Sequence, residues 1–138
     1  MFQKMLQGGG GSDEPVILLG ASYYATENIG LCLTNGLTID NTSDYFEKTI
    51  NNNKLTKLVA TKSMKIKIIS SISRTKTNIS KIIYKNDIEI IKQSLNNYGG
   101  DVREIDLDMK VGDYLSGSVS ISNTDGSNGY TLLILLIK

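Results

Sequence analysis

The chain has 138 residues, of which 40% are hydrophobic and 21% are charged, and its formal net charge is +1. A domain of this size buries a core without disulfides or metals, and the single cysteine, Cys32, excludes a small disulfide-stapled scaffold. Histidine is absent, which removes the most common general base and the most common metal ligand. We therefore expect a protein that is not an enzyme and that uses no metal and no cofactor.

The first 14 residues differ in composition from the rest of the chain. An apolar stretch precedes a run of glycines, whose ordering is entropically unfavourable, so a floppy tail is one interpretation. The other is an anchor arm, which docks its apolar side chains on a partner while the glycines act as a tether. We favour an arm at residues 1–14 and a β-sandwich domain at residues 15–138. The anchor residues are Phe2, Met5, Leu6, Gly8, Gly9, Gly10 and Gly11.

Short apolar runs separated by turn-forming residues predict β-strands from residue 16 onwards. The expected strands lie at 16–19, 29–33, 36–39, 55–60, 64–72, 79–84, 88–91, 102–109, 114–121 and 130–137. Thr34 and Asn35 predict a hairpin between the second and third of them. Only residues 43–50 look helical, with Thr42 or Ser43 as the N-cap, and a loop is the alternative interpretation of this segment. This spacing of strands and turns predicts an all-β antiparallel sandwich.

Three of these strands carry a clear pattern. In residues 64–72, Ile66 and Ile68 fall on one face and lysines on the other, a period of two that is typical of a half-buried strand. Residues 102–109 place Ile105 and Leu107 inward and a row of carboxylates outward. Residues 130–137 are almost all apolar, as expected of a strand that is buried on both faces.

The residues that could serve as a nucleophile, a phosphate loop or a metal site each have a simpler structural interpretation. Cys32 lies between two leucines and has no histidine to activate it, so we expect a buried hydrophobe. The glycine run follows no strand and therefore fails as a phosphate loop. Glu104, Asp106 and Asp108 project from one face of a strand and offer oxygens to a cation such as calcium, but a solvated acidic face is the preferred interpretation.

Charge is segregated along the chain. Every charged residue from Lys48 to Lys85 is positive, whereas residues 87–113 are mainly acidic. The segregation indicates a nucleic-acid surface, complementary edges of two subunits, or cross-strand pairs inside one sheet. Tyr84 is the only aromatic residue in the basic segment, which argues against nucleic acid, and pairing inside one sheet is favoured.

Two aromatic pairs, Tyr23–Tyr24 and Tyr45–Phe46, are candidates for a sugar or peptide site. Tryptophan is absent from the chain, which weakens the case for a carbohydrate platform. Packing in the core or at an interface is the preferred role of these side chains.

The C-terminal half carries a resemblance to a known family. It combines a turn at Lys85-Asn86-Asp87, a step from Lys110 through Gly112-Asp113 into a late strand, a polar loop and a closing apolar strand. Over residues 55–138 this order resembles the jelly-roll modules of the tumour necrosis factor and complement-globular-head type. The resemblance implies a jelly roll with a turn at Gly112-Asp113 and a final strand at the centre of a trimer.

The start of the chain, residues 1–6 followed by glycines, is similar to small structural proteins of tailed phages, in whose appendages such jelly rolls are common. We therefore expect a capsid decoration or a small tail or baseplate component, made in the host cytoplasm and located in the virion. Its partners would be other virion proteins and copies of itself, as a homotrimer, with neither nucleic acid nor a membrane. The expected self-association residues are Tyr130, Leu132, Ile134 and Leu136. The alternative is a receptor- or glycan-binding module on a virion or cell surface.

Overall fold

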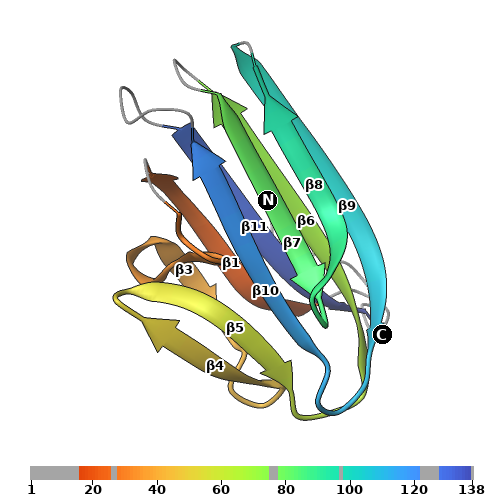
Figure 1. Cartoon of the computed structure of the whole chain (residues 1–138). Helices are drawn as coiled ribbons and strands as arrows, with labels where there is room; N and C mark the ends of the chain where they lie inside the picture. The colour runs from red at the N-terminus through yellow and green to blue at the C-terminus, as the bar shows by residue number, and fades with distance from the viewer. Residues whose placement is uncertain (1–15, 26–27, 75–77, 97, 122–127, 138) are drawn as a thin grey trace, which may run out of the picture.

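The computed structural model describes residues 16–25, 28–74, 78–96, 98–121 and 128–137. Within these ranges the chain forms two antiparallel sheets that pack face to face (Figure 1). Sheet A has the strand order β3-β1-β11-β6-β9, and sheet B has the order β2-β5-β10-β7-β8, with β4 paired to β5. The bounds in sheet A are β1 Val16–Ala25, β3 Leu37–Asp40, β6 Met64–Arg74, β9 Gly99–Met109 and β11 Asn128–Ile137. Those in sheet B are β2 Cys32–Leu33, β4 Phe46–Asn51, β5 Lys54–Ala60, β7 Ile79–Lys85, β8 Ile88–Leu95 and β10 Tyr114–Ile121.

The core lies between the two sheets and is built from the inward positions of alternating strands. Ile66 and Ile68 of β6 are 0 and 1% exposed, as the period-two pattern predicts, and Leu115 of β10 is fully buried opposite them. Ile105 and Leu107 of β9 are half-buried against the same core. The all-β sandwich expected from the sequence is confirmed, and its strand order is that of a jelly roll.

Two hairpins close on residues with positive φ. Asn86 and Asp87, at φ 51° and 66°, join β7 to β8, and Asn52 and Asn53, at φ 52° and 62°, join β4 to β5. Two successive left-handed residues form the turn type whose twist matches paired strands, and Asn and Asp adopt that conformation more readily than other side chains. The first turn was predicted, whereas the second was not.

The prediction of a helix at residues 43–50 is wrong. Phe46–Asn51 is strand β4, which pairs with β5 and inserts Phe46 into the core. The β-branched Thr49 and Ile50 favour an extended backbone, and the Asn52-Asn53 turn supplies the partner strand.

The predicted hairpin at Thr34-Asn35 is also wrong. Cys32–Leu33 pairs with β5 in sheet B, whereas Leu37–Asp40 pairs with β1 in sheet A. A short 3-10 turn at Thr34–Gly36 carries the chain from one sheet to the other. A Cβ on Gly36 would lie 2.7 Å from the Cβ of Tyr23, so this close crossing requires glycine.

The turn at Gly112-Asp113, implied by the family resemblance, is present. Gly112 has φ 92°, and the Asp113 carboxylate accepts hydrogen bonds from the Lys110 amide at 2.8 Å and from Asn86 Nδ2 at 3.0 Å. These bonds lower the pKa of Asp113. Asn86 Oδ1 in turn accepts from the Tyr114 amide at 3.0 Å, so the β7–β8 turn and the β9–β10 turn are tied together.

One polar group joins the two sheets through the core. Gln93 of β8 is fully buried, and its Nε2 donates to the main-chain oxygens of Ser70 at 3.0 Å and Asp101 at 3.1 Å. Ser70 Oγ donates back to Gln93 Oε1 at 2.7 Å. Every polar end of the side chain therefore has a partner, which allows its burial.

The described part of the chain has no helix with the length and apolarity that crossing a membrane requires.

Candidate interaction surface

The outer faces of the two sheets differ in character. On sheet B the exposed positions mix serines and charged groups with the separate isoleucines Ile50 and Ile88. Ser94 Oγ donates to Ser80 Oγ at 3.4 Å, and Lys57 Nζ lies 4.4 Å from the centre of the Tyr114 ring. On sheet A, by contrast, the outward positions hold a second hydrophobic cluster, separate from the core. Its members are Ile17, Ile39, Ile69, Leu133 and Leu135. The surface of interest is therefore the outer face of sheet A.

A β-bulge places this cluster. The register of β1 against β11 shifts between Ile17 and Leu19, so Leu18 and Leu19 both face the core and are fully buried. Ile17 then shares the outer face with Leu135, and the next outward position is Gly20, beside Leu133. The extra residue of a bulge turns a strand in this way, which explains a continuous apolar run in a strand with two different faces.

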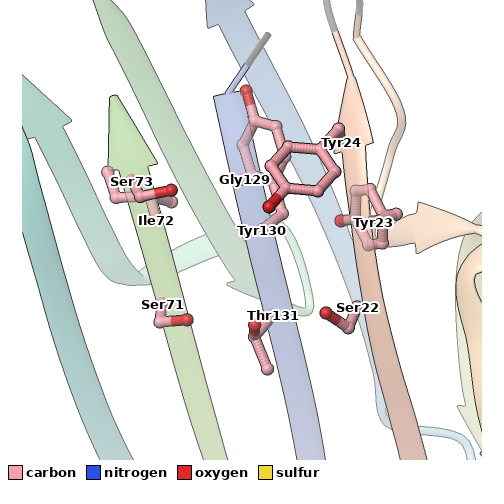
Figure 2. Close-up of a pocket in the computed structure, with 9 residues that line it drawn as sticks. All are labelled: Ser22, Tyr23, Tyr24, Ser71, Ile72, Ser73, Gly129, Tyr130 and Thr131. Atoms are coloured by element: carbon pink, nitrogen blue, oxygen red, sulfur yellow. The ribbon is translucent and has the colours of Figure 1, made fainter. Parts of the chain in front are cut away.

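The upper half of the same face, toward the ends of β1 and β6 in Figure 1, carries a hollow lined by small hydroxyl-bearing side chains and by tyrosines. A shallow cavity of about 150 Å³ lies between β1, β11 and β6. Figure 2 shows the Tyr24 ring over β11 beside Gly129, with the side chains of Ser71, Ser73 and Thr131 around the hollow. A Cβ on Gly129 would lie 2.6 Å from Ser73 Oγ, so a larger residue at this position would displace the Ser73 hydroxyl.

Two large exposed hydrophobic side chains belong to this upper half. Tyr24 is 75% exposed and pairs with Gly129, and Val102 of β9 is 66% exposed and pairs with Ser71. Tyr24 lies on β1 and Val102 on β9, the strands on either side of the β11–β6 pair that lines the hollow. Two exposed hydrophobic side chains and a shallow recess therefore share one face of sheet A.

The acidic row of β9 lies on the edge of the same face and pairs with β6. Lys67 Nζ lies 3.7 Å from Glu104 and 3.6 Å from Asp106, and Asp108 is in register with Lys65. Cross-strand pairing inside one sheet, the preferred interpretation of the charge segregation, is confirmed at this position. Exposed pairs of this kind contribute little stability and keep an edge strand soluble. Within the described ranges no three acidic or cysteine side chains converge as metal ligands.

One lysine of the basic segment is in the core instead of on the surface. Lys81 of β7 is 1% exposed, its Nζ has no hydrogen-bond partner, and it lies 5.7 Å from the centre of the Tyr130 ring. Burial lowers the pKa of Lys81 to about 8. The sequence pattern contains a signal for this placement, since Ile79 and Ile83 flank Lys81 at a spacing of two and face the core.

Cys32 and Tyr23 are core residues. Cys32 is fully buried, and burial raises the pKa of its thiol to about 12, so the thiol stays protonated and unreactive at neutral pH. Tyr23 stacks on Tyr130 at a centroid distance of 5.4 Å, donates a hydrogen bond to the Leu31 carbonyl, and has a pKa raised by burial. The packing role predicted for Tyr23 is therefore confirmed, whereas Tyr24 points to solvent.

The predicted self-association residues need a correction. Tyr130, Leu132 and Ile134 are 2% exposed or less in the core between the sheets, and Leu136 packs against the same core. β11 is apolar on both faces, so its sequence alone does not distinguish the inward set from the outward one. The outward set is Thr131, Leu133 and Leu135. The anchor residues Phe2, Met5, Leu6, Gly8, Gly9, Gly10 and Gly11 lie outside the described residues.

Comparison with known proteins identifies the fold. No family model and no curated protein matches the sequence. Among solved structures, rabbit GITRL is 13% identical with a TM-score of 0.51, covering 87% of this chain and 94% of its own. Eiger TNF from S. frugiperda is 12% identical with a TM-score of 0.51, covering 91% of this chain and 94% of its own. Murine APRIL is 7% identical with a TM-score of 0.51, covering 84% of this chain and 97% of its own. At these identities the likeness shows the fold alone, and that fold is the jelly roll of the tumour necrosis factor type.

Proposed function

We propose that this chain is a non-enzymatic binding domain that acts as a homo-oligomer, and that its copies meet over the upper half of the outer face of sheet A. The observation that carries the proposal is the combination of exposed hydrophobic side chains and a recess on the outer face of sheet A. Tyr24 and Val102 are exposed on this face, and Tyr24 lines the recess, whereas Ile50 and Ile88, the exposed hydrophobic side chains described in sheet B, line no such recess. Small side chains allow two sheets to approach closely, and exposed aromatic and aliphatic side chains provide the apolar area of such a contact.

The expected assembly is a trimer. The resemblance to tumour necrosis factor modules implies three copies around the final strand, and β11 is the central strand of sheet A. Tumour necrosis factor-type neighbours support recognition of a receptor better than a role inside a virion. A capsid, tail or baseplate role is a narrower proposal that none of these neighbours supports.

The oligomeric state tests the proposal. Light scattering on the full chain should give three times the chain mass of 15.1 kDa. Tyr24→Asp with Val102→Asp should lower the mass to that of one chain, because two charges would be buried at the contact. Ile88→Asp with Val111→Asp, at positions 69 and 67% exposed but outside this face, should leave the mass unchanged. A wild-type monomer at all concentrations up to the millimolar range contradicts self-association.

The hollow itself favours a second candidate function, saccharide binding. Hydroxyl groups of Ser71, Ser73 and Thr131 surround it, and the Tyr24 ring offers a face on which a sugar can stack (Figure 2). A glycan array probed with the full chain tests this candidate. Tyr24→Ala should abolish any signal, whereas Tyr98→Ala, which changes an equally exposed tyrosine outside the hollow, should not. An array signal that survives Tyr24→Ala places saccharide binding elsewhere.

A further inference from the structure

Three side chains on the outer face of sheet A are more buried than their position explains. Ile17, Leu133 and Leu135 are only 4, 8 and 6% exposed, values typical of the core, although they stand on the outside of a two-layer sandwich. The described neighbours in their cluster, Ile39 and Ile69, stand beside them on the same face and are only half-buried. A leucine on an open sheet face keeps its outer end in water, so these three require a covering segment.

Only one undescribed part of the chain has the length and the attachment point for such a cover. The other internal undescribed segments, residues 26–27, 75–77, 97 and 122–127, adjoin the strand ends at Ala25, Arg74, Leu95 and Ile121, whereas Ile17 and Leu135 pair at the opposite end of β1. Residue 138 is a single lysine. Residues 1–15, in contrast, end at Val16, next to Ile17, and 15 residues reach up to about 50 Å when extended.

The composition of that segment fits the cluster. It contains Phe2, Met5 and Leu6, separated from β1 by four glycines that let the chain reverse direction. We propose that the N-terminal segment is an intramolecular strap, whose apolar side chains pack on Ile17, Leu133 and Leu135 of the same chain. The strap fills the lower, apolar half of the face and leaves the upper half around Tyr24 and Val102 open, so the proposal does not depend on self-association.

Disulfide trapping in the full chain tests the strap. In a Cys32→Ala background, Leu6→Cys is combined either with Ile69→Cys, a half-buried member of the cluster, or with Ile88→Cys, on the sheet B side. Mild oxidation, followed by non-reducing electrophoresis and peptide mapping, reports the disulfide that forms. The strap predicts an intramolecular disulfide at least tenfold faster for the Ile69 pair than for the Ile88 pair. Equal rates overturn the proposal, and so does a disulfide that forms mainly between two chains, because the segment would then cover a second copy.

A second measurement leaves sheet A unaltered. Phe2→Asp with Leu6→Asp should raise the fluorescence of a hydrophobic dye several-fold by exposing the cluster, whereas Gln3→Asp with Gln7→Asp adds the same charge and should not. Equal fluorescence in the two variants overturns the strap. Light scattering on the same samples separates the two proposals, because a monomeric wild type refutes self-association while the trapping and dye results still decide the strap.

Discussion

Replacing the buried lysine by a hydrophobic residue of similar length should stabilise the protein. Lys81 is 1% exposed, its Nζ has no hydrogen-bond partner, and its pKa falls from 10.5 to about 8 on folding. A shift of that size corresponds to about 3 kcal/mol at about 1.4 kcal/mol per pKa unit. Lys81→Met keeps the side-chain length and removes the charge, so at pH 7 the variant should be more stable by about 3 kcal/mol.

The pH dependence identifies the cause. Below pH 8 lysine is protonated in both states, and the folded state carries the whole penalty of burying the charge. Between pH 8 and 10.5 the unfolded chain binds more protons at this site, so the Lys81 contribution to stability rises with pH. Cys32, Tyr23 and Tyr130 act in the opposite direction above about pH 9, because burial raises their pKa values and only the unfolded chain ionises. Both proteins share those three groups, so the difference between wild type and variant isolates Lys81.

Urea unfolding followed by circular dichroism at one protein concentration, from pH 7 to pH 10.5, measures this difference. The advantage of Lys81→Met should be largest at pH 7 and should disappear toward pH 10.5. Lys92→Met, which changes an exposed lysine of β8, should differ from wild type by a few tenths of a kcal/mol at every pH. A Lys81→Met variant that is no more stable than wild type at pH 7, or an advantage that does not vary with pH, refutes the reasoning.

The remaining predictions concern the core and one turn. Gln93→Ala should lower stability by about 2–3 kcal/mol, because it removes the hydrogen bonds to Ser70 and Asp101 and leaves the buried Ser70 hydroxyl without its acceptor; an unchanged urea midpoint contradicts this. Asn86→Ala should lower the melting temperature by more than Asn86→Gly does, since both lose the side-chain hydrogen bonds but only alanine is strained at φ 51°. The Cys32 thiol should not react with a disulfide reagent at pH 8 until urea unfolds the chain, and rapid labelling of the native protein would contradict its burial.

Local pattern alone was sufficient for much of the fold. Alternation in residues 64–72 and 102–109 predicted both the strands and their inward faces, because in a strand the side-chain direction follows directly from position. The Asn86 turn was predictable for a similar reason, since the chemistry of a tight turn is contained in two residues.

Strand partners were not predictable in the same way. Thr34-Asn35 has the composition of a hairpin turn, yet the strands on either side of it belong to different sheets, and Phe46–Asn51 became a strand only because β5 is available to pair with it. Pairing depends on contacts between residues distant in the sequence, and no local window contains them.

The candidate surface shows the same division between sequence and structure. The sequence by itself determined that β11 is apolar on both sides and that Lys81 alternates with two isoleucines. The tertiary structure decided that Tyr130, Leu132 and Ile134 face the core while Leu133 and Leu135 face outward, and that a bulge in β1 brings Ile17 beside them. The physical reason is that alternation along a strand divides its residues between two faces of the sheet but does not specify which face is buried. The second sheet, which packs on one side, decides which face becomes the core and which is left for a partner.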